Sequence, residues 1–246
     1  MAEANAAEPI LRLQGVQTHI GPYHILHGVS FAVPRGGVTM LLGRNGAGKT
    51  TTLRTIMGLW QASAGTVSFD GADITRHSTP AIAQAGIAYV PENMSVFSDL
   101  TVAENMRLAA RTGAIDERRL DWVFRMFPAL KTFWHQRAGV LSGGQKQMLS
   151  IARAIVEPRR LILVDEPTKG IAPAIIDNMI RAFKELKRAD TTILLVEQNF
   201  RFAEALGDFA LVMDDGRIVH RDSMAALSRD TATQARLLGL SLEAHG

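Results

Sequence analysis

A glycine-rich segment at residues 43–50, Gly-Arg-Asn-Gly-Ala-Gly-Lys-Thr, constrains the fold of this chain more than any other feature. It fits the P-loop pattern, in which glycines let backbone N–H groups close around phosphate oxygens. Lys49 is placed to reach the outer phosphates, and Thr50 offers a hydroxyl to Mg²⁺. An apolar strand expected over Val38–Leu42 leads into the loop, and a helix expected over Thr50–Leu59 follows it. Because strand, loop and helix come in the order that a P-loop requires, the sequence predicts a site for a nucleoside triphosphate and Mg²⁺.

The loop and the first turn of the following helix are expected to contact the nucleotide. That helix begins near Gly48, and its positive dipole end points toward the phosphates. The expected contact residues are Gly43, Arg44, Asn45, Gly46, Ala47, Gly48, Lys49, Thr50 and Thr51.

The rest of the chain predicts an α/β fold with one inserted helical region. From residue 145 onward, helices and strands alternate, a pattern typical of a parallel sheet flanked by helices. A long helical stretch at about residues 95–150 interrupts this alternation, and a closing hairpin and helix are expected at about 209–238. The other expected strands are Ile10–Val16, Val29–Val33, Thr66–Phe69, Ile87–Val90, Leu161–Val164 and Thr192–Val196, and the other expected helices are 79–85, Gln145–Val156 and Pro173–Arg188. We therefore predict a single domain over residues 10–246.

Composition excludes several kinds of site. Apolar residues make up 47% and charged residues 21% of the chain, which is ordinary for a globular domain. The chain has no cysteine, which excludes disulfides and thiolate metal sites. Its net charge of +3 is weak evidence for any anionic partner, and no apolar run approaches the roughly 20 residues needed to cross a bilayer. The first nine residues lack the basic charge and apolar core of a secretory signal, so we expect a cytoplasmic protein.

A second motif, Leu-Ser-Gly-Gly-Gln at residues 141–145, narrows the nucleotide chemistry. It is the signature sequence of ATP-binding-cassette (ABC) ATPases, and with the P-loop it makes the chain resemble the ATPase subunit of an ABC transporter over about residues 10–225. The resemblance implies ATP as the nucleotide and a P-loop NTPase fold with a mixed sheet, an N-terminal antiparallel β subdomain and a helical lobe. It also implies a dimer in which the signature of one cassette closes on ATP held by the other. The signature residues expected to do so are Ser142, Gly143, Gly144 and Gln145.

The strand expected over Leu161–Val164 ends in two adjacent carboxylates, Asp165 and Glu166. Downstream of a P-loop, this pattern resembles the Walker B element, in which the acid that closes the strand supports Mg²⁺, usually through water. We assign that role to Asp165. The family resemblance implies that Glu166 is the general base, which polarises the water that attacks the γ-phosphate.

Several positions depart from the commonest ABC pattern. Glu92 stands where many members have a glutamine, and its carboxylate is expected to reach Mg²⁺ or water. Gln198 replaces the switch histidine; it can hydrogen-bond the γ-phosphate but cannot take up a proton near neutral pH, so we expect a positioning role. Ile20 occupies the position of the tyrosine that stacks on adenine, and Tyr23 follows three residues later. Either Tyr23 stacks on the base or the base lies on an aliphatic surface, and we favour Tyr23.

These departures recur together in one branch of the family. The segments Val-Pro-Glu, Gly-Ile-Ala-Pro and Val-Glu-Gln-Asn resemble the second ATPase subunit of bacterial branched-chain amino-acid importers, whose close relatives drive urea and short-chain amide uptake. An exporter ATPase is a further alternative, which the last two segments disfavour. The cassette of such a transporter never touches the solute, so the sequence leaves the substrate open.

The same resemblance implies partners at the inner face of the cell membrane. They are two membrane permease subunits, a second ATPase subunit and, indirectly, a periplasmic solute-binding protein. A heterodimer of ATPase subunits is expected, with a homodimer as the alternative. Met94, Val96 and Phe97 are candidates for the permease contact, with ordinary packing inside the lobe as the equal alternative. ABC ATPases that act on nucleic acid usually carry two cassettes or a long coiled-coil insertion, and residues 50–141 leave room only for the usual lobe, so no nucleic-acid partner is expected.

Overall fold

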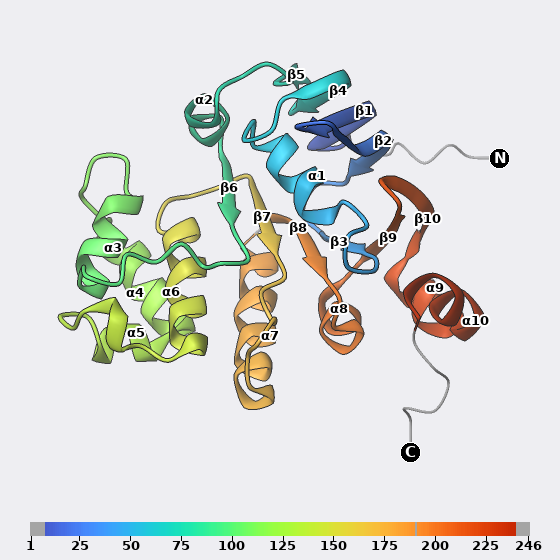
Figure 1. The fold of residues 1–246 in the computed structure, drawn as a ribbon. Helices are drawn as coiled ribbons and strands as arrows, with labels where there is room; N and C mark the ends of the chain where they lie inside the picture. Colours follow the sequence, from blue (N-terminus) through green and yellow to red (C-terminus); the bar gives the residue numbers. More distant parts are fainter. Residues whose placement is uncertain (1–7, 190, 240–246) are drawn as a thin grey trace.

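The computed structural model describes residues 8–189 and 191–239. The expected domain range of 10–246 therefore extends beyond the described residues at residues 190 and 240–246. Figure 1 shows two β-sheets with one helix, α1, between them and a group of helices beside the larger sheet.

The larger sheet has six strands in the order β10-β9-β3-β8-β7-β6. Five of these strands are parallel, and β10 runs antiparallel to β9, so the sheet is mixed, as the family resemblance implied. The strands β3, β7 and β8 are buried along their whole length, which explains why they appear in the sequence as continuous apolar runs. The six strands are β3 (Val38–Leu42), β6 (Ile87–Val90), β7 (Leu161–Asp165), β8 (Thr192–Glu197), β9 (Phe209–Asp214) and β10 (Arg217–Ser223).

The central strands send their side chains alternately to two cores. On β8, Ile193 and Leu195 pack into the core on the helical side of the sheet, whereas Leu194 and Val196 pack into the core that the smaller sheet covers. This alternation follows from the two-residue period of a strand. Helices that contribute to the first core include α7 (Pro173–Arg188) and α8 (Phe200–Leu206), and α1 (Lys49–Ile56) and α2 (Thr79–Gln84) contribute to the second.

The smaller sheet is antiparallel, with the order β2-β1-β4-β5, and forms the N-terminal subdomain implied by the family resemblance. Its first two strands are longer than the sequence predicts, because the apolar pattern fades toward the hairpin turn at Gly21. The pairing of β1 with β2 shifts register at three places, and the last shift, between Thr18 and His19, lies near that turn. The strands are β1 (Leu11–Ile20), β2 (Tyr23–Val33), β4 (Ala62–Phe69) and β5 (Ala72–Asp73).

The helical lobe lies at the opposite side of the larger sheet from β10 (Figure 1). Val123 and Met148 of the lobe belong to the same buried cluster as Val164 of the sheet, so the lobe shares its core with the rest of the domain. The lobe contains α3 (Val102–Ala109), α4 (Glu117–Met126), α5 (Pro128–Thr132), the 3₁₀ turn η1 (Ala138–Val140) and α6 (Gly143–Ile155).

The C-terminal part of the described chain differs from the expected single helix at about 223–238. It forms α9 (Met224–Arg229), α10 (Thr231–Thr233) and the π-helical turn η2 (Gln234–Leu238). The break falls at Asp230, whose side chain accepts a hydrogen bond from the backbone N–H of Thr233 and so starts a new helix instead of continuing the old one. None of the described helices combines the length and the apolar character needed to span a bilayer.

Candidate nucleotide site

The P-loop connects β3 to α1 and contains three glycines with left-handed backbone angles. The φ angles of Gly43, Gly46 and Gly48 are 150°, 83° and 101°. At Gly43, an added Cβ would lie 2.2 Å from the carbonyl oxygen of Met213, so no other residue fits without moving the backbone. At Gly46, an added Cβ would meet nothing within 4 Å. The loop is therefore packed closely on one side and open on the other, which leaves room for a phosphate-bearing ligand.

Lys49, the first residue of α1, holds its ammonium group inside the loop. Its Nζ donates hydrogen bonds to the carbonyl oxygens of Gly43 at 2.9 Å and of Arg44 at 3.0 Å, and it lies 3.5 Å from Oε1 of Glu166. Only 4% of the lysine side chain is exposed. A buried cation is costly unless it is hydrogen-bonded and paired with an anion. Carbonyl oxygens and a carboxylate thus compensate Lys49 here, in the way that phosphate oxygens would compensate it in a nucleotide complex.

Asp165, the last residue of β7, joins the P-loop helix to β6. Its Oδ1 accepts a hydrogen bond from the hydroxyl of Thr50 at 3.0 Å, and its Oδ2 accepts one from the hydroxyl of Tyr89 at 3.1 Å. Burial raises the pKa of Asp165, and these two hydrogen bonds oppose that rise. Burial and the nearby Asp165 charge also raise the pKa of Tyr89, which keeps Tyr89 a donor. The oxygens of Thr50 and Asp165 are therefore adjacent, and both are ligand types that suit Mg²⁺.

Glu166 follows directly and has a backbone conformation that is unusual for a residue with a side chain. Its φ of 43° lies in the left-handed region, where a non-glycine residue stores strain of a kind that clusters at functional sites. Its side chain is 8% exposed and lies between two ammonium groups, 3.5 Å from Nζ of Lys49 and 3.6 Å from Nζ of Lys169. The carboxylate is therefore held between two cations beside the P-loop.

Lys169 links Glu166 to Glu92, and sequence reasoning assigned no role to this lysine. Its Nζ donates a hydrogen bond to Oε1 of Glu92 at 2.6 Å, and this contact raises the pKa of Lys169. Both side chains are partly exposed. The structure thus brings Glu92 to the same pocket as Glu166, as the sequence predicts, but it pairs the Glu92 carboxylate with a lysine. The only sequence signal for this pair was a cation three residues after Glu166.

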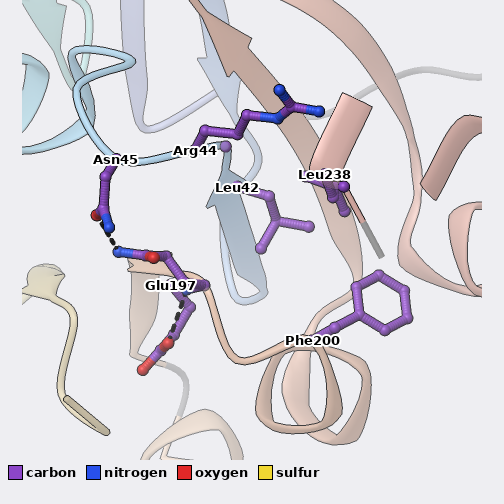
Figure 2. Close-up of a pocket in the computed structure, with 9 residues that line it drawn as sticks. Leu42, Arg44, Asn45, Glu197, Phe200 and Leu238 are labelled. Atoms are coloured by element: carbon purple, nitrogen blue, oxygen red, sulfur yellow. Dashed lines mark hydrogen bonds between the residues drawn. The ribbon is translucent and has the colours of Figure 1, made fainter. Parts of the chain in front are cut away.

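Gln198 lies between Glu166 and the P-loop. Its Nε2 donates hydrogen bonds to Oε1 of Glu166 and to Oδ1 of Asn45, each at 2.6 Å. Figure 2 shows the contact with Asn45. An amide supplies two N–H donors on one nitrogen, so both acceptors are satisfied at once. This geometry suits the positioning role that the sequence predicts for Gln198.

Lys49, Thr50, Glu92, Glu166 and Lys169 contribute to the lining of a pocket of about 350 Å³. A neighbouring pocket of about 490 Å³ shares Asn45 with it and is lined by Gly43, Arg44 and Gln198 among others (Figure 2). Ala47 lines neither pocket, because its side chain packs in the core beneath the loop. The residues that line the first pocket are Ile25, Asn45, Gly46, Gly48, Lys49, Thr50, Thr51, Glu92, Glu166 and Lys169.

Tyr23 is not among these lining residues, and 70% of its side chain is exposed. Ile25, two residues further along β2, lines the pocket instead. Tyr23 nevertheless faces Ile20 as its direct cross-strand partner, so it stands beside the position where the family has its adenine-stacking tyrosine. Both alternatives for the adenine surface therefore stay open, with Ile25 as the aliphatic candidate.

The signature residues lie apart from the pocket, at the start of α6 in the helical lobe (Figure 1). Ser142 caps this helix by accepting a hydrogen bond from the backbone N–H of Gln145, and the Gln145 side chain accepts one from the backbone N–H of Ser142. Gly143 is exposed, whereas a Cβ on Gly144 would lie 3.0 Å from a methyl group of Ile175. The signature residues of this chain line neither pocket, and their contact with a nucleotide across a dimer stays a prediction.

Comparisons with known proteins agree on one family. A model of the ABC transporter family matches residues 26–169. The chain is 40% identical to the high-affinity branched-chain amino acid transport ATP-binding protein BraG of Pseudomonas aeruginosa, over 94% of this chain and 100% of that protein. It is 38% identical to a probable branched-chain amino acid transport ATP-binding protein, LivF, of Archaeoglobus fulgidus, over 79% and 84% of the two chains.

Solved structures with a similar fold come from the same family. A crystal structure of a nucleotide-free ATP-binding cassette from an ABC transporter superposes with a TM-score of 0.81 at 25% sequence identity, over 95% of this chain and 99% of that one. The predicted fold class, an α/β P-loop NTPase of the ABC type, is thereby confirmed. With its P-loop pocket, this chain belongs to the ABC transporter family as an ATP-binding subunit that hydrolyses ATP.

Proposed function

We propose that this chain powers the uptake of branched-chain or other small amino acids through separate permease subunits. The observation that carries the proposal is the 40% identity with BraG along the whole of that protein, which is named a branched-chain amino acid transport ATP-binding protein. The segments Val-Pro-Glu and Val-Glu-Gln-Asn distinguish this branch in the sequence. Glu92 of the first segment lines the pocket, and Gln198 of the second lines the neighbouring pocket and donates a hydrogen bond to Glu166. Import of urea or short-chain amides is the alternative, and an exporter ATPase is a weaker one.

In this proposal the P-loop holds the phosphates and Lys49 contacts the outer ones. The buried ammonium of Lys49 already requires anionic partners, and phosphate oxygens replace Glu166 in that role. Thr50 and Asp165 hold Mg²⁺, which neutralises charge on the phosphates. Their oxygens lie next to each other at the end of β7, and their chemistry fits a hard divalent cation. Glu92 can supply a further oxygen ligand for Mg²⁺ once its hydrogen bond from Lys169 is broken.

Glu166 is the proposed general base, because its carboxylate is held beside the P-loop and is hydrogen-bonded by Gln198. Gln198 orients that carboxylate and the γ-phosphate but carries no proton in the reaction. Thus the proton taken from the attacking water resides on Glu166 in this chain.

The proposed assembly is a dimer of ATPase subunits on the inner side of the cell membrane, bound to two permeases. Ser142, Gly143, Gly144 and Gln145 contact the nucleotide held by the partner subunit, which is a second kind of ATPase subunit or a second copy of this chain. We propose the permease contact at Phe97, which is 50% exposed. The centre of its ring lies 5.1 Å from Cζ of the Arg153 guanidinium. Val96 packs against the core of the lobe, which favours the packing interpretation for that residue. The proposed domain is the cassette over 10–246.

The test is uptake of labelled leucine and labelled urea in a strain that lacks this gene. The strain is complemented with the wild-type gene, with Glu166→Gln, or with Glu204→Gln as a matched control on the exposed side of α8. Leucine uptake restored by the wild type and the control, but not by Glu166→Gln, is the expected result. Dependence of urea uptake alone would favour the amide branch. Uptake of both solutes without the gene would contradict the importer assignment and leave the ATPase assignment intact.

A further inference from the structure

Glu197, the last residue of β8, is a buried carboxylate that faces four hydrogen-bond donors. Its Oε1 accepts from the backbone N–H and the hydroxyl of Thr168, at 3.0 and 2.7 Å. Its Oε2 accepts from the backbone N–H groups of Gln198 and Asn199, at 2.8 and 3.0 Å. Only 2% of Glu197 is exposed. Glu197 lines the neighbouring pocket, and Figure 2 shows its side chain pointing away from Asn45.

The carboxylate of Glu197 has no cation to balance it among the residues that the structure describes, since no Lys, Arg or His nitrogen lies within 4.0 Å. A buried anion of this kind is tolerated only when hydrogen-bond donors replace its lost hydration. Four N–H or O–H groups do so here, one for each lone-pair site of the two oxygens. Each oxygen therefore accepts two hydrogen bonds. A carboxylate has two such oxygens, whereas an amide has only one.

The four donors come from two different segments. Thr168 lies two residues after Glu166, in the turn that leaves β7, whereas Gln198 and Asn199 begin the turn that leaves β8. A second link joins the same two segments, because the Gln198 amide donates to Glu166. The bonds to Glu197 connect the two backbones, and the bond from Gln198 to Glu166 connects the two side chains that are proposed to act on the nucleotide.

We infer that Glu197 is a positioning residue for ATP hydrolysis. It ties the turn that carries Glu166 to the turn that carries Gln198, so that the Gln198 amide stays within 2.6 Å of both Glu166 and Asn45. Glu197 itself contacts neither phosphate nor water in this role. The inference rests on the proposed roles of Glu166 and Gln198 and adds that Glu197 keeps these two side chains close together.

The test compares Glu197→Gln, Gln198→Ala and the double variant in the purified full chain. In Glu197→Gln one oxygen becomes an NH₂ group, which cannot accept a hydrogen bond. In either orientation of the amide at least one backbone N–H, that of Thr168 or those of Gln198 and Asn199, loses its acceptor with almost no change in volume. We expect kcat to fall by at least about tenfold, while KM and the Kd for a fluorescent ATP analogue measured without Mg²⁺ stay within about threefold. A smaller fall in kcat, or a Kd that weakens in proportion, would overturn the inference.

The double variant separates positioning from a general loss of structure. If Glu197 acts through Gln198, the double variant loses much less than the product of the two single losses, because the second change removes nothing further. Losses that multiply in full would show that Glu197 acts independently of Gln198 and would refute the inference.

A milder variant keeps the inference testable if Glu197→Gln does not fold. Thr168→Val removes the hydroxyl donor and keeps the backbone N–H, so it is expected to lower kcat by about threefold with the Kd unchanged; an unaltered kcat would argue against the inference. Failure of the proposed function looks different. In that case Glu166→Gln would hydrolyse ATP as fast as the wild type, whatever Glu197→Gln does.

Discussion

The contact between Lys49 and Glu166 predicts how the nucleotide-free cassette responds when Glu166 loses its charge. The two side chains are 4% and 8% exposed, and their charged atoms lie 3.5 Å apart. At an effective dielectric constant of about 20, their attraction at this distance is about 5 kcal/mol before desolvation is counted. Removing one member of a buried pair leaves the other uncompensated and typically costs about 3–5 kcal/mol.

For Glu166→Gln the expected cost is smaller than that range. Lys49 keeps its hydrogen bonds to the carbonyl oxygens of Gly43 and Arg44, and the new amide still offers an oxygen. We expect a loss of about 2 kcal/mol in the free energy of unfolding. In a domain of this size that corresponds to a fall in Tm of about 4–8 °C.

The assay is differential scanning calorimetry with and without ATP, in EDTA so that no hydrolysis occurs. ATP brings phosphate charge to Lys49 in both proteins, so it should raise the Tm of Glu166→Gln by several degrees more than that of the wild type. Glu204→Gln, an exposed site, is the matched control and should behave like the wild type. If Glu166→Gln and the wild type unfold at the same temperature without nucleotide, Glu166 does not compensate Lys49 and the reasoning fails.

Three further predictions concern residues in or near the pocket. Burial raises the pKa of Asp165 in the folded protein above its value in the unfolded chain. The nucleotide-free protein therefore loses stability as the pH rises from about 4, the unfolded pKa, to the higher folded pKa, and the loss is constant above that. Asp165→Asn should therefore raise the Tm at pH 7 by a few degrees but leave it unchanged at pH 3, while ending Mg²⁺-dependent hydrolysis; a lower Tm at pH 7 would contradict this. Tyr23→Ala should weaken ATP binding by about threefold or more, measured by fluorescence titration, and an unchanged Kd would point to Ile25 as the adenine surface. Lys169→Met should change the unfolding free energy by less than about 1 kcal/mol in urea titrations, because Lys169 and Glu92 are partly exposed and Glu166 keeps Lys49 as a cation; a larger loss would reveal a structural role.

The sequence predicts the central strands well for a physical reason. Val38–Leu42 matches β3, and Leu161–Val164 falls one residue short of β7, because parallel strands buried on both faces must be apolar throughout. The helix Pro173–Arg188 also matches, since a proline fits only its first turn. Helix breaks are harder to predict. The sequence around Asp230 contains no glycine or proline, so only the folded structure shows that this residue ends α9 and caps α10.

For the site, the sequence predicts residues that belong to one contiguous motif and misses pairs that only the fold creates. The P-loop fixes Lys49 and Thr50 by local spacing alone. By contrast, the contact of Glu92 with Lys169 joins positions 77 residues apart, and a cation three residues after Glu166 does not by itself indicate Glu92 as its partner. Glu197 is missed for the same reason, because its four donors come from two segments that meet only when β7 and β8 pair.

The charges around the pocket lead to one more expectation about nucleotide and metal. Glu92 and Glu166 line the pocket together with Lys49 and Lys169, and Asp165 lies beside it through its hydrogen bond with Thr50, so these five groups, when all are ionised, carry one net negative charge before any nucleotide arrives. Metal-free ATP adds several more negative charges and meets repulsion from the carboxylates. In the proposed site, Mg²⁺ bound by Asp165 and Glu92 would offset that repulsion and would replace Lys169 as the cation beside Glu92. Binding of ATP and Mg²⁺ should therefore be mutually reinforcing, with each raising the affinity for the other by the same factor.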